Sequence, residues 1–335
     1  YVEALKIRKR VLGDEHPETL NAMNNLATLY TDQSRYAEAE PLLVETLKIR
    51  KRVFGDEHPR TQGVMNNLAA LYYGQGRYAE AEPLYVETLE IRKRVLGDEH
   101  PDTLRVLNNL AILYWNQGRY TEAEPLYVEV LEIRKRVLGD ERPITMATNV
   151  DLGRLYILME RYEDAAAMFE TSVPVCRRVL GMQHTQTADA MNGLATSYDH
   201  LGRQDEALAL RRELLDLQTA SADSPDADAN TLNTAAMTRL THAVQEFLDP
   251  RRALGYAERA CTMEEAAGGG NLWMYLHTLA LAQHQTGDAA AAVETQQHAI
   301  SLLAADHPER ADYEQRLVEY KAALAESSIS GDKRP

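Results

Sequence analysis

Apolar residues recur along the first two thirds of the chain with helical spacing, in paired segments separated by short polar turns. In residues 17–54, the first apolar stripe consists of Leu26, Ala27, Leu29 and Tyr30. After the polar stretch 32–35, a second stripe consists of Ala39, Leu42, Leu43, Leu47, Ile49 and Val53. The pattern predicts one helix that begins at Pro17 and a second that begins at Tyr36 and ends at Gly55.

This helix pair is repeated every 42 residues, with glycines at positions 13, 55, 97, 139 and 181, most of them in the phrase Leu/Phe-Gly-Asp-Glu-His-Pro. The phrase Asn-Asn-Leu-Ala occupies 24–27, 66–69 and 108–111, and becomes Val-Asp-Leu-Gly at 150–153. Alanines recur where two helices must approach closely, as at Ala27 and Ala39. A tyrosine column at 30, 72, 114, 156 and 198 is predicted to lie in the core.

The phrase Leu26-Ala27-x-x-Tyr30, followed by a turn and then Ala39 and Leu47, resembles the tetratricopeptide repeat. The 42-residue unit, with its Asn-Asn-Leu-Ala, Tyr-x-Glu-Ala-Glu-Pro-Leu and Leu-Gly-Asp-Glu-His-Pro phrases, is similar to the kinesin light chain subclass. This resemblance implies an all-α fold, a right-handed α-solenoid of helix-turn-helix repeats. It also implies that the first helix of each pair lines a concave groove.

We expect four segments along the chain. Residues 1–218 form the regular array, and the small, acidic residues 219–230 form a linker. Residues 231–326 form two divergent repeats and a C-terminal capping helix, and residues 327–335 form a disordered tail. Tyr1 aligns with Leu43 in the second helix of a repeat. We therefore expect a fragment of a larger protein, with an apolar N-terminal end that offers a surface for self-association.

Composition narrows the classes of partner. The chain is 44% hydrophobic and 26% charged, with a net charge of −15, which excludes a disordered acidic chain. No apolar run approaches the ~20 residues of a membrane helix, so no membrane partner is expected. An acidic surface repels phosphate backbones, so nucleic acid is not an expected partner. Cys176 and Cys261 are widely spaced and suit a small apolar core role, which favours a cytoplasmic location.

Repeated polar residues offer the main candidates for chemistry, and we interpret each of them structurally. Histidines occupy one position in four repeats, with an arginine in the fifth: His16, His58, His100, His184 and Arg142. Metal ligands converge within about 2 Å of one ion, whereas successive repeats lie ~10 Å apart, so the histidines are predicted to start helices. Basic triplets at 50–52, 92–94 and 134–136 suit the negative ends of helix dipoles. No catalytic motif is present, so we expect no enzymatic activity and no cofactor.

The doubled asparagines are the strongest candidates for function, because asparagine is a mediocre helix former and something must favour it here. One interpretation is an amide ladder between repeats. The other is hydrogen bonding to a peptide in the groove, since the position of Asn25, Asn67 and Asn109 commonly carries a ligand-contacting asparagine in tetratricopeptide proteins. The candidate groove residues are Asn24, Asn25, Asn66, Asn67, Tyr73, Asn108, Asn109, Ile112, Trp115 and Asn116. Tyr73 and Trp115 are predicted to form a pocket for an apolar or aromatic anchor.

The leading functional hypothesis is a scaffold that binds a peptide segment of a partner protein in the groove. Resemblance to kinesin light chains implies capture of short linear motifs, often an aromatic residue among acidic ones. The alternative is a regulatory or sensor arm of a larger signalling enzyme, a kinase or nucleotide-hydrolysing ATPase, whose catalytic domain lies upstream of Tyr1. Because Val150 and Asp151 replace the asparagine pair, binding is expected to weaken at the fourth repeat.

Overall fold

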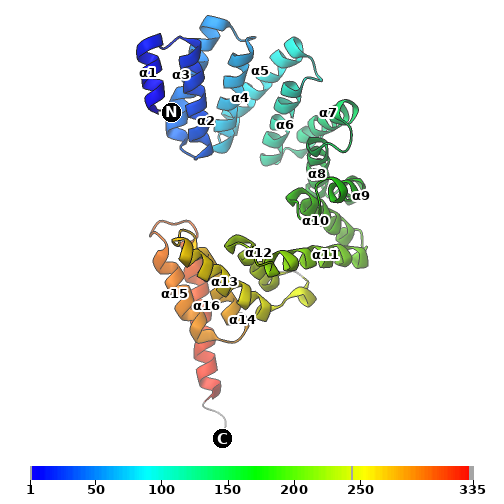
Figure 1. The fold of residues 1–335 in the computed structure, drawn as a ribbon. Helices are drawn as coiled ribbons and strands as arrows, with labels where there is room; N and C mark the ends of the chain where they lie inside the picture. The colour runs from blue at the N-terminus through cyan, green and yellow to red at the C-terminus, as the bar shows by residue number, and fades with distance from the viewer. Residues whose placement is uncertain (1, 243, 332–335) are drawn as a thin grey trace. The chain divides into compact units, whose positions relative to one another are not determined.

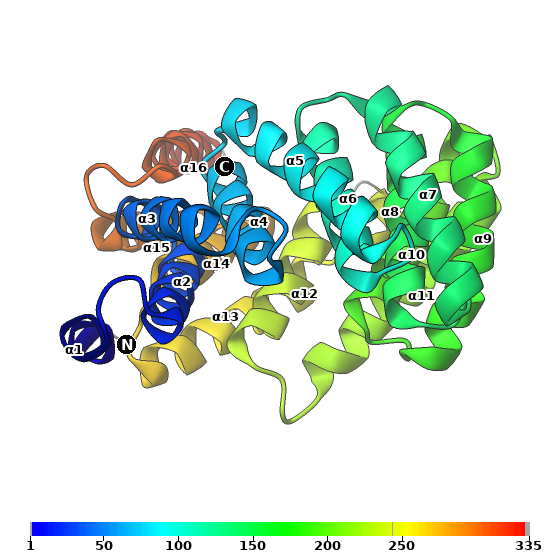
Figure 2. The ribbon, with the colours of Figure 1, turned by 90° about the horizontal axis from the view of Figure 1, so that it is seen from above.

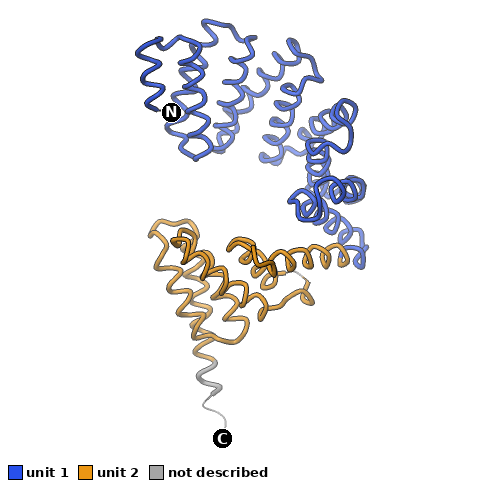
Figure 3. Tube along the Cα trace, viewed as in Figure 1, with its two compact units in different colours: residues 1–207 blue, residues 208–335 orange. Residues whose placement is uncertain are grey.

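The computed structural model describes residues 2–242 and 244–331, without the side chains of 327–331. These residues contain sixteen α-helices, one short 3-10 helix and no strand, which confirms the predicted all-α solenoid (Figure 1). The chain divides into two compact units, residues 1–207 and 208–335 (Figure 3). Unit 1 contains α1 (Val2–Leu12), α2 (Pro17–Asp32), α3 (Tyr36–Phe54), α4 (Pro59–Gly74), α5 (Tyr78–Leu96), α6 (Pro101–Asn116), α7 (Tyr120–Leu138), α8 (Pro143–Leu158), α9 (Tyr162–Val179) and α10 (Thr185–His200).

Helix α11 (Gln204–Asp223) spans the boundary between the units. Unit 2 then contains α12 (Ala229–Thr241), the 3-10 helix η1 (Gln245–Phe247), α13 (Pro250–Ala267), α14 (Leu272–Gln285), α15 (Ala289–Leu302) and α16 (Arg310–Gly331).

The helix boundaries of unit 1 confirm the predictions at Pro17, Tyr36 and Gly55. The four histidines start helices as expected: in His16, His58, His100 and His184, Nδ1 accepts the backbone N–H two residues further on, at 3.1–3.2 Å. This bond satisfies one of the donors left unpaired at a helix start. Arg142, in the same position of α8, makes no such bond.

Alanine and tyrosine columns hold each helix pair together. Ala27 and Ala39, with their equivalents Ala69, Ala81, Ala111 and Ala123, are fully buried, as close approach of the helices requires. The tyrosine column is buried or half-buried, and the turn arginine of the same repeat lies over each ring, 4.2 Å away for Arg77 on Tyr72. The prediction that these tyrosines pack in the core is confirmed.

Charged side chains bridge neighbouring repeats in a regular ladder. The guanidinium of Arg77 binds Glu80 of its own repeat at 2.6 Å and Glu40 of the preceding repeat at 2.7 Å. Arg119 repeats this arrangement with Glu122 and Glu82. These contacts explain the paired glutamates that recur on the surface. Because exposed ion pairs contribute only ~0–1 kcal/mol each, the buried apolar columns supply most of the stacking energy.

The first two residues of the basic triplet 50–52 have roles that the helix dipole alone does not explain. The first arginine, Arg50, is only 2% exposed and therefore belongs to the core. Lys51 pairs with Asp56 at 3.5 Å, as the predicted local electrostatics requires, and with Glu87 of the next repeat at 2.8 Å. Val53, predicted to be buried, is instead 44% exposed because it lies on the outer face of α3.

The first helices of unit 1 lie on the inner side of its curve. The backbones of α2 and α4, and those of α8 and α10, approach each other closely, whereas successive second helices in the described residues are joined through long side chains such as Lys51 and Glu87. Viewed from above, α7 and α9 lie outside α6, α8 and α10 (Figure 2). A row of helices that approach each other more closely than their partners do must form the concave side.

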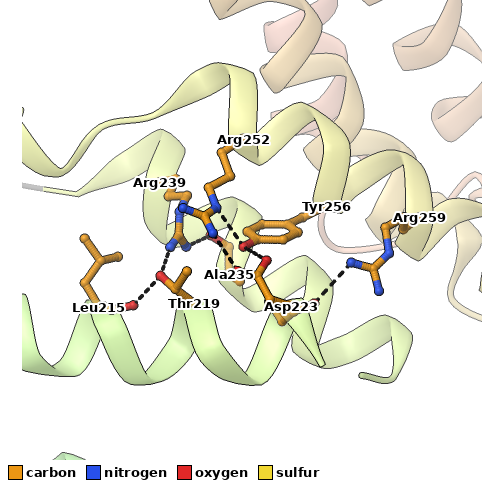
Figure 4. Close-up of polar contacts among 9 residues, drawn as sticks. Leu215, Thr219, Asp223, Ala235, Arg239, Arg252, Tyr256 and Arg259 are labelled. Carbon is orange, nitrogen blue, oxygen red and sulfur yellow. Dashed lines mark hydrogen bonds and ion pairs between the residues drawn. The ribbon is translucent and has the colours of Figure 1, made fainter. Parts of the chain in front are cut away.

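The predicted linker over 219–230 is wrong for residues 219–223, which continue α11, and for residues 229 and 230, which begin α12. The small residues there pack closely: Ala222 is fully buried, and Asp223 accepts hydrogen bonds from Tyr256 and Arg252, both at 2.6 Å. Arg239, 3% exposed, donates to Thr219 and to the Ala235 carbonyl (Figure 4). Only residues 224–228 connect α11 to α12, and the end of α11 is an integral part of unit 2.

Helix α16 closes the hydrophobic core of unit 2. Tyr313 and Tyr320, two turns apart, are buried against α14 and α15, while Glu314 and Lys321 are exposed. The helix continues through residues 327–331, part of the predicted tail, while 332–335 lie outside the described residues. Across residues 2–242 and 244–331, no helix has the length and apolar composition needed to span a membrane.

Candidate functional site

The predicted groove residues lie together on the first-helix face of unit 1, formed by α2, α4 and α6. Asn66 is buried, while Asn25 and Asn116 are exposed. The half-buried members are Asn24, Asn67, Tyr73, Asn108, Asn109, Ile112 and Trp115. The face thus presents partly accessible amides and aromatic rings in register from one repeat to the next.

The asparagines form the amide ladder that one interpretation predicted. Nδ2 of Asn67 donates to Oδ1 of Asn24 at 3.0 Å, and Nδ2 of Asn109 donates to Oδ1 of Asn66 at 3.2 Å. No described residue donates to Oδ1 of Asn67 or Asn109, so these two acceptors stay available on the face. The ladder and the groove interpretations are therefore compatible for these residues.

Replacing Asn67 by alanine is expected to lower the unfolding free energy by about 1 kcal/mol, because its inter-repeat hydrogen bond to Asn24 and the longer one to Thr28, at 3.5 Å, are lost. The matched variant is Asn25→Ala, since Asn25 is exposed and has no preceding asparagine rung. Both substitutions raise the helix propensity by the same amount. The difference between the unfolding free energies of the two variants therefore measures the contribution of the amide ladder. Urea unfolding followed by circular dichroism measures it. Equal midpoints for the two variants would refute a stabilising ladder.

Tyr73 and Trp115 occupy equivalent positions on α4 and α6 and are neither fully exposed nor core residues. The Tyr73 ring lies 5.8 Å from that of Tyr78, and its hydroxyl accepts from Asn116 Nδ2 at 2.9 Å. Trp115 packs edge-on against Tyr127 at 6.1 Å, and the Arg154 guanidinium lies 5.7 Å from its ring. These contacts hold both rings in place while part of each stays accessible. The anchor pocket between them stays a prediction.

Asp151 ends the amide ladder at the fourth repeat. It occupies the position of Asn67 and Asn109, and an ionised carboxylate has no proton to donate to Asn108. Burial raises the pKa of Asp151 to about 6; nearby Asp189 adds to this rise, whereas Arg154 and Arg134 oppose it. The folded chain therefore holds a proton at Asp151 more strongly than the unfolded chain does.

The variant Asp151→Asn is expected to raise the unfolding free energy at pH 7 by about 1–3 kcal/mol. The ionised, half-buried carboxylate is removed, and an amide that can donate to Asn108 replaces it. Since the folded pKa lies above the unfolded value of ~3.9, this destabilisation of the parent grows as pH rises from about 4 to 6. Unfolding curves at pH 4 and pH 7 measure it. A variant advantage that is the same at both pH values would contradict this assignment.

A second feature of the same face was missed by sequence reasoning. A cavity of about 400 Å³ spans three repeats and is lined by Asn21, Asn24, Arg50, Pro59, Arg60, Gly63, Val64, Asn67 and Arg105. The basic triplet pattern predicts for Arg50 only a favourable interaction with the helix dipole. The signal that could have found it is its spacing, because Leu43, Thr46, Leu47 and Arg50 share one buried helical face.

Residues that could support metal chemistry do not converge in the part of the chain that the structure describes. No group of three or more His, Cys, Asp or Glu side chains has a geometry that could hold a metal ion there. The cysteine thiols of Cys176 and Cys261 are buried, and burial raises the pKa of both, to about 12 for Cys261. Both cysteines therefore stay protonated and act as small apolar core residues, as predicted.

Comparison with solved structures finds the same architecture. A kinesin light chain-type protein with nearly identical repeats from Podosopora anserina is 27% identical, with a TM-score of 0.57, and covers 62% of this chain and 99% of its own. BtubC (BKLC) from P. vanneervenii is 22% identical, with a TM-score of 0.59, and the match covers 67% of this chain and 90% of BtubC. The apo quorum sensor NprR from B. thuringiensis is 18% identical, with a TM-score of 0.59, and the match covers 90% of this chain and 81% of NprR. This likeness concerns the fold alone.

Comparison with family profiles identifies repeats along the chain. Tetratricopeptide repeat profiles match residues 1–18, 19–60, 60–136, 105–177, 144–220 and 275–303. A comparison with curated protein sequences finds no match. The profile matches together cover well over half of the sequence, and the last of them falls on α14 and α15 of unit 2. The chain therefore belongs to the tetratricopeptide repeat family, and its 42-residue units resemble those of kinesin light chain-type members.

Proposed function

We propose that the chain is a protein-interaction scaffold that binds an extended segment of a partner protein along the first-helix face of unit 1. The observation that carries this proposal is the register of accessible groups: Tyr73 and Trp115, and the acceptors of Asn67 and Asn109, recur one repeat apart. An extended peptide rises about 3.3 Å per residue. Repeats ~10 Å apart can therefore contact every third residue of such a peptide.

The chemistry of the face suits a peptide backbone. An extended segment carries unpaired N–H and C=O groups that must find partners when they leave water. The free Oδ1 atoms of Asn67 and Asn109 accept backbone N–H groups without breaking the ladder. Half-buried aromatic rings contribute large contact areas at low entropic cost, as binding hot spots do. The 42-residue repeats resemble those of a kinesin light chain-type structure. Since that resemblance implies capture of short linear motifs, it favours a peptide motif as the ligand.

The test compares capture of a partner from source-cell lysate by the parent and by the variant Asn67→Ala/Asn109→Ala/Trp115→Ala. Circular dichroism must first show that the variant is still helical. The control is Val53→Ala/Val95→Ala/Val137→Ala, which alters exposed residues of the second helices. The proposal predicts a protein retained by the parent and the control and lost by the first variant. Equal retention by all three would place the binding site elsewhere.

A further inference from the structure

Arg50 differs from its equivalents in the next two repeats. Arg92 donates to the Asp102 carbonyl at 2.8 Å, and Arg134 donates to Thr148. Each of these arginines thus reaches the first helix of the following repeat. Arg50 donates to Asn21 at 2.7 Å, on the first helix of its own repeat. Arg50 lines the cavity of about 400 Å³ that opens between α2, α4 and α6.

This cavity has a positive charge that no described carboxylate neutralises. Arg105 is paired with Asp102 at 2.8 Å, but neither Arg50 nor Arg60 forms an ion pair with any described residue. Arg50 is 2% exposed, and its Nε, like that of Arg92, has no hydrogen-bond partner. A buried, ionised donor with an unmet bond is costly unless an anion or water satisfies it. The two arginines leave about two positive charges at one site.

Gly63 keeps the cavity open. The equivalent positions in the flanking repeats carry Asn21 and Arg105, whereas a Cβ built on Gly63 would meet no atom within 4 Å. Amides of Asn21, Asn24 and Asn67 complete the lining and can donate further hydrogen bonds.

We propose that this cavity binds a phosphate monoester dianion. Two uncompensated guanidinium groups match the charge of a phosphate dianion, whereas one carboxylate would leave one of them unpaired. Since Asn24 and Asn67 also belong to the proposed peptide face, the inference rests on the proposed function only for the source of the phosphate. That source is either a phosphorylated side chain of the bound partner or a free phosphorylated small molecule.

The test is calorimetric titration of the whole chain with inorganic phosphate at pH 7.5 and fixed ionic strength, with acetate as the monoanion probe. Arg60→Ala removes an exposed arginine, and Gly63→Leu fills the cavity from a position with room for a side chain. Each is expected to weaken phosphate binding about tenfold or more, since a charge-assisted bond or the space for the ligand is lost. The control is Arg94→Ala, which makes the same charge change outside the cavity. Saturable phosphate binding that only the first two variants weaken is the expected result.

Three outcomes would overturn the assignment: no saturable phosphate binding, equal weakening by Arg60→Ala and Arg94→Ala, or acetate binding as tight as that of phosphate. A phosphoserine peptide that binds tighter than inorganic phosphate would assign the phosphate to a partner protein, and the reverse order would assign it to a small molecule. Failure of the peptide face alone is distinguishable, because Trp115→Ala removes partner binding without touching the cavity and is expected to leave phosphate affinity unchanged.

Discussion

The variant Phe169→Ala is expected to lower the unfolding free energy by about 3–5 kcal/mol, the cost of emptying a large, well-packed core site. Phe169 is fully buried at the junction of α8, α9 and α10. Its ring lies where a Cβ on Gly153 or Gly193 would stand, only 2.8 and 2.3 Å from its Cζ atom. Leu43, Tyr85 and Tyr127 hold the equivalent position in earlier repeats, without a glycine pair of this kind.

Urea unfolding of the parent and the variant measures this effect. Gly193→Ala is expected to be destabilising by about 1–3 kcal/mol for the opposite reason, overpacking against the same ring. Combining Gly193→Ala with Phe169→Leu should recover part of the lost unfolding free energy, since the smaller leucine side chain leaves room for the new methyl group. If Phe169→Ala costs less than about 1 kcal/mol, the ring does not hold α8, α9 and α10 together as described.

The variant Trp115→Ala is expected to weaken the binding free energy for the partner by about 2–4 kcal/mol, which raises the dissociation constant roughly 30- to 1000-fold. Trp115 is half-buried, fixed by the edge of Tyr127 and covered on one side by Arg154. A ring held in place before binding loses little entropy when a partner packs on it. The fold should stay intact, because the residue lies outside the fully buried columns.

Trp115→Phe is the matched variant, because it keeps an aromatic ring at the same position. It is expected to retain most of the affinity lost by the alanine change. Surface-immobilised chain and the captured partner give both dissociation constants. A Trp115→Ala chain that binds as tightly as the parent, or that unfolds at room temperature, would show that Trp115 is a packing residue and no anchor.

The repeat made most of unit 1 predictable from sequence. A 42-residue frame fixes the helix pairs, the helix starts at the histidines and the buried alanines, because each copy obeys the same local rules. The small, acidic composition of residues 219–223 predicts a linker, whereas Asp223 makes two long-range contacts, with Tyr256 and Arg252. Amino-acid composition indicates the local conformational preference of a segment. It gives no information about a contact with residues about 30 positions further along the chain.

The candidate site was predictable only in part. The pattern placed Asn67, Asn109, Tyr73 and Trp115 on one face, and they lie there. The pattern could not choose between ladder and groove, because an amide has enough donors and acceptors to serve both. The whole-chain charge of −15 also obscured the cavity at Arg50, since net charge averages over a surface whose local sign varies. The regulatory-arm alternative stays a hypothesis.

The proposed function requires the first-helix face of unit 1 to contact a partner segment directly. Site-specific photo-crosslinking tests it, with a photoreactive phenylalanine analogue at position 116 on that face or at position 95 on the outer side of α5. Both positions are exposed, so neither label should disturb the fold. We expect the label at 116 to crosslink to one defined segment of the partner, Trp115→Ala to abolish this crosslink, and the label at 95 to give none. Crosslinks from position 95 without any from position 116 would contradict the proposed function.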